Sequence, residues 1–154
     1  MGISAVIITK NEARNIERCL LSLRDIADEV IVVDSSSTDG TQDIARNLGA
    51  RVVEMEWQGY AATKNAGNDL ATQDYILSLD ADEALSDTLR SHITRHTNQL
   101  QGTYSFNRLA YYCGQPIRHA GWYPDRKMRL FPKDKARWEG AFVHEELVAD
   151  SDLS

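Results

Sequence analysis

The sequence has few cysteines, no long apolar run and no excess of positive charge. Each of these absences argues against a class of protein. Its two cysteines, Cys19 and Cys113, do not have the spacing of a metal site, which predicts buried thiols in a reducing cytoplasm. No apolar segment is long enough to span a bilayer, and the apolar start has no basic flank of the kind that a signal peptide carries. The formal net charge of −6 argues against a nucleic-acid partner.

Glycine-rich phosphate-binding motifs are also missing. No G-x-G-x-x-G follows the first predicted strand, and no G-x-x-x-x-G-K-[ST] occurs, so a nicotinamide-binding Rossmann domain and a P-loop nucleotide hydrolase are both disfavoured. The sequence has 154 residues, of which 42% are hydrophobic and 26% are charged. This mix is typical of a globular domain that can bury a core, and we expect a single domain over residues 1–154.

Short β-branched runs alternate with helical repeats over the first hundred residues. The runs predict strands at 3–9, 29–33, 51–55 and 75–79. Helices are expected after Asn11, after Thr38 or Asp39 as far as Gly49, at 60–70, and from Ser86 to about residue 100. Weaker strand signals follow at 103–112 and 127–131, and no further element is visible before the end. This order predicts an α/β fold with a mostly parallel central sheet and helices on both faces.

Polar residues follow three of the predicted strands, where ligands bind in parallel sheets. The first strand leads into Thr9-Lys10-Asn11-Glu12, whose side chains offer hydrogen bonds to a base or a ribose. Asp34 ends the second strand and has two readings that are about equal on local grounds: it accepts from a ribose hydroxyl or base N–H, or it caps a helix from a serine-rich turn.

Asp80-Ala81-Asp82 follows the fourth strand and is the sharpest feature of the sequence. Two carboxylates at this spacing suit a hard divalent cation, which completes its coordination with water and substrate phosphate. Such a cation would neutralise the charge that develops on a diphosphate leaving group. The alternative reading is a polar strand end that caps the next helix.

Three further groups are candidates for a site. Lys64 can reach a phosphate, and Gly67 permits close packing or the close approach of a ligand. A glutamate in His144-Glu145-Glu146, after the Trp138-Glu139-Gly140 turn, is a candidate general base beside aromatic residues, with His144 orienting it or moving a proton. Residues 118–137 carry seven basic and two acidic residues, a local charge of +5, which either faces an anionic acceptor, a diphosphate or a membrane surface, or is a solvated face.

Taken in order, these clusters resemble family-2 glycosyltransferases of the Rossmann-like GT-A fold. The residues that carry the resemblance are SAVIITKNEARNIERCLLSL, EVIVVDSSSTDGT, KNAGNDLATQDYILSLDADE and MRLFPKDKARWEGAFVHEEL. GWYPDRKMRLF followed by VHEE carries a narrower resemblance to the bacterial lipopolysaccharide-core glucosyltransferase branch. The resemblance covers nearly the whole chain, and its specificity comes from the order of the four motifs.

The resemblance implies an inverting, metal-dependent transfer of a sugar, glucose in this branch, from a UDP-sugar to a lipopolysaccharide-core or related glycan acceptor. Residues 1–100 would form the nucleotide-binding half and 101–154 the acceptor-side half. Mg²⁺ or Mn²⁺ would be the cofactor, and the implied setting is the cytoplasm with a peripheral contact at the inner membrane. By resemblance, the donor-site residues are Thr9, Asn11, Glu12, Asp34, Lys64, Asp80 and Ala81, the metal ligands are Asp80 and Asp82, Gly121 lies near the acceptor, and Glu145 is the catalytic base with His144 beside it.

Two departures from the family pattern leave alternatives open. The family usually has an acidic pair at the base position, so the base is Glu145, Glu146 or Glu139. Members of this branch are longer, so we expect the chain to be incomplete at its C-terminus, with elements that contact acceptor and membrane missing. A domain that binds a nucleotide-sugar without transfer, and a sugar nucleotidyltransferase, are the two alternative functions.

Overall fold

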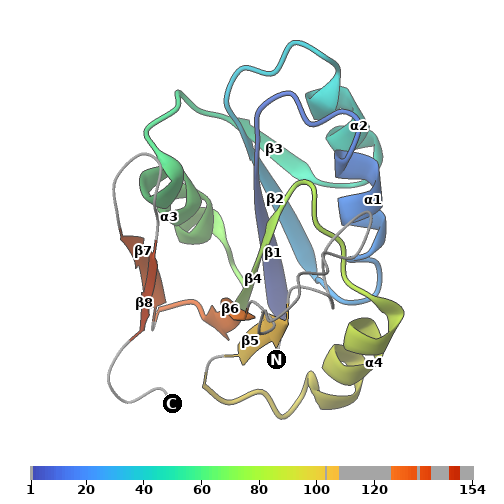
Figure 1. The fold of residues 1–154 in the computed structure, drawn as a ribbon, viewed down its shortest axis with the longest axis vertical. Coiled ribbons are helices and arrows are strands. Elements are labelled where there is room, and N and C mark those ends of the chain that lie inside the picture. Colours follow the sequence, from blue (N-terminus) through green and yellow to red (C-terminus); the bar gives the residue numbers. More distant parts are fainter. Residues whose placement is uncertain (1, 103, 108–125, 135, 140–145, 150–154) are drawn as a thin grey trace, which may run out of the picture.

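The structure is a computed structural model and describes residues 2–102, 104–107, 126–134, 136–139 and 146–149. Strands and helices alternate over the first hundred residues, as the sequence predicts (Figure 1). The strands are β1 (Ile3–Thr9), β2 (Glu29–Asp34), β3 (Arg51–Glu54), β4 (Tyr75–Asp80), β5 (Tyr104–Asn107), β6 (Arg126–Pro132), β7 (Ala136–Glu139) and β8 (Glu146–Ala149). The helices are α1 (Ile16–Leu21), α2 (Thr41–Asn47), α3 (Tyr60–Leu70) and α4 (Asp87–His96).

Six strands form the central sheet in the order β3-β2-β1-β4-β6-β5. The first four are parallel to one another, whereas β6 runs antiparallel to β4 and β5 antiparallel to β6. The register pairs Thr9 with Asp34 and Ile8 with Asp80, so the ends of β1, β2 and β4 lie at one level of the sheet. The predicted mostly parallel sheet is confirmed, and it brings the polar clusters to one edge.

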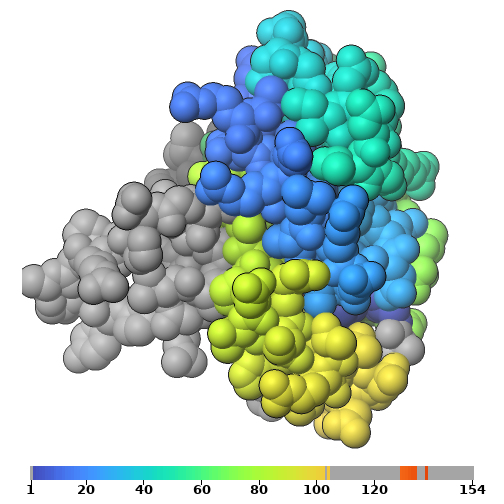
Figure 2. All heavy atoms as spheres, turned by 90° about the vertical axis from the view of Figure 1, so that its right-hand side faces the viewer, coloured from blue at the N-terminus to red at the C-terminus, as the bar shows by residue number. Residues whose placement is uncertain are grey.

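Helices cover both faces of this sheet, which is also as predicted. Side chains of α1, α2 and α4 join the larger hydrophobic core on one face, and Figure 2 shows this side from outside. Helix α3 packs on the other face, where Leu70 lies against the smaller core around Ile76 and Phe131. The central strands are buried on both faces, which explains why their sequences are almost continuously apolar.

Helix boundaries separate correct predictions from wrong ones. Ser86 caps α4, because its Oγ accepts from Leu89 N at 3.1 Å, and Gly49 follows α2 with a φ of 91°. Asn11 does not cap α1, which begins only at Ile16. The Asn11 backbone has a φ of 55°, and its Oδ1 accepts from Thr38 N at 2.8 Å instead. A contact with a second loop has replaced the local cap.

The late strands were only partly foreseen. Strand β6 confirms the predicted run at 127–131, and β5 confirms part of the run at 103–112, whose remainder lies outside the described residues. Trp138 and Glu139, interpreted from the sequence as part of a turn, belong instead to β7. The expectation of no further element is also wrong, because β8 pairs with β7. β7 and β8 have four residues each, and their sequences do not show the β-branched run by which the equally short β3 is recognised. No helix within the described ranges combines the length and the apolar character that crossing a membrane demands.

Candidate functional site

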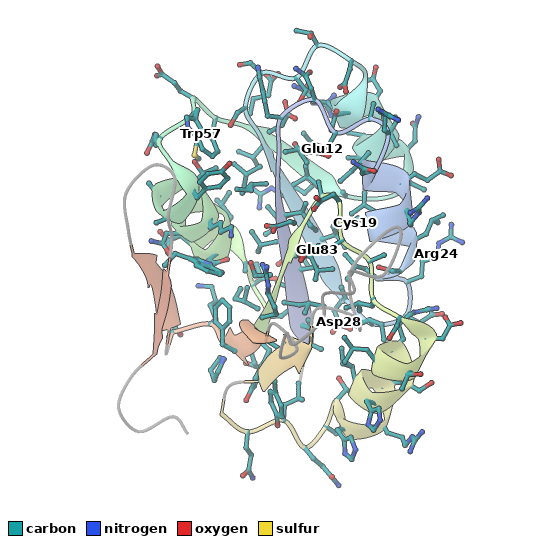
Figure 3. All side chains as sticks on the ribbon, in the orientation of Figure 1. Glu12, Cys19, Arg24, Asp28, Trp57 and Glu83 are labelled. Atoms are coloured by element: carbon teal, nitrogen blue, oxygen red, sulfur yellow. The ribbon has the colours of Figure 1, made fainter. Side chains whose placement is uncertain are left out.

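A cleft of about 1150 Å³ opens at the carboxyl ends of the four parallel strands. It extends from the turn after β4, across the ends of β1 and β2, to the segment between β3 and α3. In Figure 3, Glu12 after β1 and Trp57 before α3 both lie toward this end of the sheet. The lining residues are Ile8, Thr9, Lys10, Glu12, Ser35, Ser36, Glu54, Met55, Glu56, Trp57, Tyr60, Asp80, Ala81 and Asp82.

One wall of the cleft consists of two loops that are held together by hydrogen bonds. Thr38 N of the β2–α2 loop donates to Asn11 Oδ1 in the β1–α1 loop. In four further bonds the β1–α1 loop supplies the donor, and the acceptors lie in the β2–α2 loop or at Thr41, the first residue of α2. The bonds run from Lys10 Nζ to Ser36 O (3.0 Å), Asn11 N to Ser37 Oγ (2.7 Å), Glu12 N to Thr41 Oγ1 (2.9 Å) and Ala13 N to Asp39 Oδ2 (3.0 Å). Asn11, predicted to bind nucleotide, uses its side chain to join these loops, whereas Thr9 and Glu12 line the cleft.

Asp34 is fully buried and does not line the cleft. Its carboxylate accepts from Thr9 Oγ1 (2.6 Å), from Ser37 N (2.8 Å) and Oγ (2.6 Å), and from Gln42 Nε2 (2.7 Å). Burial by itself raises the pKa of Asp34, but the hydrogen bonds from Ser37, Thr9 and Gln42 together hold that pKa below its ordinary value. The ionised Asp34 therefore supports the cleft indirectly, by holding the cleft-lining Thr9 through a hydrogen bond.

The turn after β4 places two carboxylates at the cleft. Glu83 N donates to Asp80 O at 2.9 Å, and the Glu83 side chain returns to accept from Asp80 N at 2.7 Å, so the turn is closed twice. Asp82 is exposed, and the Asp80 side chain is 43% exposed. Both carboxylates and buried Ala81 line the cleft, as the sequence predicts for a ligand site at a strand end.

Buried cations flank Asp80. Lys64 Nζ from α3 lies 3.7 Å from Asp80 Oδ1, and Arg129 Nη2 from β6 lies 3.6 Å from Asp80 Oδ2. Arg129 also lies 3.5 Å from Glu83 Oε2. These contacts correct one sequence expectation for the basic run 118–137. Its member Arg129 is only 5% exposed and pairs with Asp80 and with the buried Glu83, so it does not face a membrane or an acceptor.

Glu83 is a residue that the sequence analysis missed. Its side chain is buried, with 4% of the residue exposed. Burial and the nearby charges of Asp80 and Asp82 raise the pKa of Glu83 to about 7, although the Arg129 guanidinium lowers it. Its position three residues after Asp80 was the available signal, because a carboxylate there can return to the N–H that opens the turn. Glu83 holds the shape of the turn that presents Asp82.

The donor set at this turn fits a hard divalent cation. Asp82 offers exposed carboxylate oxygens, and Mg²⁺ in proteins takes one or two carboxylates and keeps positions for water and phosphate. In the part of the chain that the structure describes, no three His, Cys, Asp or Glu side chains gather as a metal cage. The exposed oxygens of Asp82 suit a cation of this kind, which keeps other positions for water and phosphate.

An aromatic pair stands at the other end of the cleft and was also missed. Trp57 and Tyr60 are 39% and 38% exposed, and their rings meet edge to face with centroids 4.8 Å apart. Only their position directly after the third strand could have pointed to them. Two partly exposed rings beside a polar cleft offer an apolar surface for a flat or hexose-like group.

The remaining residues named in the sequence analysis are either packed in the core or outside the described residues. Gly67 packs closely under the sheet, which confirms its predicted packing role: a Cβ there would lie 2.6 Å from Val6 Cγ1 and 2.9 Å from Val33 Cγ2. Cys19 is buried, and its Sγ lies 3.7 Å from Asp80 O. Gly121, His144 and Glu145, like Cys113, lie outside the described residues.

The comparison with known families decides what kind of protein has this cleft. The family profile "Glycosyl transferase family 2" matches residues 4–144. The chain belongs to glycosyltransferase family 2. This membership decides against a sugar nucleotidyltransferase, and its fold is the GT-A fold expected from the motifs.

Individual family members show how far the likeness extends. An uncharacterised glycosyltransferase of Rickettsia bellii is 47% identical over 84% of this chain and 42% of its own length. The lipopolysaccharide core biosynthesis glycosyltransferase LpsC of Rhizobium meliloti is 29% identical over 99% of this chain and 59% of its own. The crystal structure of Staphylococcus aureus TarS residues 1–349 superposes with a TM-score of 0.53, at 28% identity, over 64% of this chain and 33% of that one.

These matches have one common feature, which is that the relatives are longer. The chain spans about half the length of the curated relatives it matches. The likeness to LpsC supports the expected resemblance to the lipopolysaccharide-core branch of the family.

Proposed function

We propose that this family-2 glycosyltransferase moves a hexose, with glucose as the first candidate, from a UDP-sugar to a lipopolysaccharide-core or related glycan acceptor with inversion at the anomeric carbon. The observation that carries the proposal is the cleft at the ends of β1–β4, which has exposed carboxylates at one end and exposed aromatic rings at the other. A nucleoside diphosphate with a divalent cation on its phosphates matches both ends, because the cation can bind the carboxylates and the base can lie on the aromatic rings.

The donor diphosphate belongs at the β4 end of the cleft in this proposal. Asp82 and Asp80 would hold Mg²⁺ or Mn²⁺, which would neutralise the charge on the departing UDP. Lys64 and Arg129 hold Asp80 between them, so that its carboxylate keeps a fixed position next to Ala81. Thr9 and Glu12 line the path to the nucleoside, and Asp34 and Asn11 support that path through Thr9 and through the two joined loops.

The acceptor side is proposed for the segment that follows β6. A carboxylate there, Glu145 in the first instance and otherwise Glu146 or Glu139, would take the proton of the acceptor hydroxyl as that oxygen attacks the anomeric carbon, with His144 beside it. The bond to UDP breaks as the new glycosidic bond forms. We place this reaction in the cytoplasm, with peripheral contact at the inner membrane, in keeping with the low cysteine content and the LpsC likeness.

The first test is calorimetric titration of UDP into the chain with Mn²⁺ and again with EDTA, for the wild type and for Asp82→Asn. We expect binding that needs the metal, and a loss of at least tenfold in affinity in Asp82→Asn, because the substitution removes a charged oxygen ligand without changing the side chain's size. Asp69→Asn makes the same chemical change at an exposed carboxylate near the C-terminal end of α3, outside the cleft lining; it is the matched control and is expected to bind within twofold of the wild type.

Two results would contradict the proposal. UDP binding that is the same in Mn²⁺ and EDTA would remove the metal from the site. A folded chain that binds UDP but turns over no UDP-hexose would leave a nucleotide-binding domain without transfer, which is the alternative function named above.

A further inference from the structure

Asn65, in the middle of α3, bonds to both backbone polar groups of one residue in β7. Its Nδ2 donates to Trp138 O at 2.8 Å, and its Oδ1 accepts from Trp138 N at 2.8 Å. On its other side β7 pairs with β8, where Trp138 stands opposite Leu147. Alternate residues of an antiparallel strand direct both backbone groups away from the partner strand, and Asn65 satisfies such a pair. One side chain thus does here what a third strand would do.

The neighbouring residue of the helix contacts the same tryptophan. Lys64 Nζ lies 4.1 Å from the centroid of the Trp138 ring and 3.7 Å from Asp80 Oδ1. Lys64 is 2% exposed and Trp138 is 7% exposed, so the cation–π contact is shielded from water, where such contacts are strongest. Trp138 is therefore held twice, through its backbone by Asn65 and through its ring by the lysine that also faces the donor-site carboxylate.

This double contact joins the donor side of the site to the acceptor side. Figure 1 shows the β7–β8 pair standing alongside α3, apart from the central sheet. The register of the pair sets Glu139, the last residue of β7, opposite Glu146, the first residue of β8. Of the three glutamates considered for the base, these two lie in the pair and Glu145 precedes Glu146 in the sequence, and the pair is attached to α3 through Trp138.

We propose that Asn65 is a positioning residue for sugar transfer: by docking β7 on α3 it sets the place of the β7–β8 pair, which contains Glu139 and Glu146, relative to the donor carboxylates. The inference rests on the proposed function for the identity of the transfer step. It adds a residue whose side chain bonds to the backbone of Trp138 and which acts on the alignment of donor and base through that strand. A misplacement of about 1 Å between reacting groups costs on the order of a hundredfold in rate, so such a residue acts on the chemical step.

The test compares Asn65→Ala and Asn65→Asp with the wild type. Asn65→Ala removes both hydrogen bonds, and Asn65→Asp keeps the acceptor but turns the donor into an oxygen that faces Trp138 O. Asn47→Asp makes the same chemical change at an exposed position on α2, on the other face of the sheet, and is the matched control. UDP affinity in Mn²⁺, steady-state release of UDP from a panel of UDP-hexoses, and amide hydrogen exchange are measured for each protein.

We expect both Asn65 variants to bind UDP within about twofold of the wild type and to keep the donor KM within about threefold. Their kcat should fall about 10- to 100-fold, and amide exchange should accelerate in β7 and β8 but not in β1–β4. The Asn47→Asp control should match the wild type in all three measurements.

Each other outcome overturns a different statement. If kcat is retained while exchange in β7 and β8 accelerates, Asn65 only stabilises the β7–β8 pair. If UDP affinity and kcat fall together, Asn65 supports the donor cleft and not the alignment. A wild-type chain that fails to bind UDP, or binds it and turns over none of the UDP-hexoses, overturns the proposed function before any variant is compared.

Discussion

At the scale of single residues, Glu83 shows how a buried carboxylate serves a neighbouring site at a cost in stability. Its side chain closes the turn by accepting from Asp80 N, and Arg129 lies beside it. Burial nevertheless outweighs the guanidinium and raises the pKa of Glu83 to about 7. The folded protein therefore holds a proton on Glu83 over a pH range in which the unfolded chain has lost it.

Stability should consequently fall with pH because of this one group. Below pH 4.5 Glu83 is protonated in both states, and between pH 4.5 and about 7 only the folded state keeps the proton. The folded state then binds more protons, so the free energy of unfolding decreases as pH rises through this window, by on the order of 3 kcal/mol in all. Glu83→Gln keeps an oxygen for Asp80 N and carries no titrating group.

Urea unfolding of both proteins at pH values from 4.5 to 8 measures the effect. The difference between wild type and Glu83→Gln should shift in favour of the variant as pH rises, and level off above pH 7. Parallel curves for the two proteins would show that Glu83 titrates normally in the folded state. Asp34, whose pKa is lowered, makes the opposite contribution, which is lost only as pH falls through its folded value.

At the scale of elements, α3 is the helix on which the site depends. Its N-terminal residue Tyr60 lines the cleft, Lys64 faces Asp80, and Asn65 holds β7. The helix reaches these partners because its backbone lies unusually close to the sheet at Gly67, where Val6 and Val33 leave no room for a side chain. The absence of a side chain at Gly67 thus allows α3 to pack this close to the sheet.

Gly67→Ala should destabilise the protein by about 1–3 kcal/mol, because the added methyl group overlaps two β-branched side chains inside a packed core. This sign is opposite to that expected from helix propensity, by which Ala is favoured over Gly by about 1 kcal/mol. The cost should shrink in a Val6→Ala background, in which the nearer contact is gone, and a double-mutant cycle by chemical denaturation measures that coupling. Equal costs in both backgrounds would place the strain elsewhere.

At the scale of the whole molecule, donor and acceptor functions are expected to separate. Glu145→Gln should leave UDP affinity in Mn²⁺ within twofold and reduce UDP-hexose turnover by 10²- to 10⁴-fold, the usual contribution of a general base. Glu146→Gln and Glu139→Gln are the comparison variants, and turnover in all three identifies the base. Full turnover in Glu145→Gln would move the role to one of the other two.

The sequence alone predicted the layers of the fold and the edge at which the polar residues meet. This succeeded because β1, β4 and most of β2 are buried, so their apolar runs are almost continuous, and because parallel strands bring Thr9, Asp34 and Asp80 to one edge. The sequence-based prediction failed where contacts between residues far apart in the chain determine what a side chain binds. Asn11 exchanged a helix cap for a bond to the next loop, and Arg129 is buried because its partners come from β4 and from the turn that follows.

The place of β6 in the sheet has consequences for folding during synthesis and for the design of chimeric proteins. Residues 1–100 contain every donor-side candidate, yet without β6 the strand β4 would be an open edge, with its backbone groups unpaired and Arg129 absent from Asp80 and Glu83. During synthesis Asp80 can pair with Lys64 first, whereas Glu83 gains the positive charge of Arg129 only after the ribosome has delivered β6. An engineered chimera that exchanges the acceptor segment for another has to supply a strand at this position, with a cation at the register of Arg129.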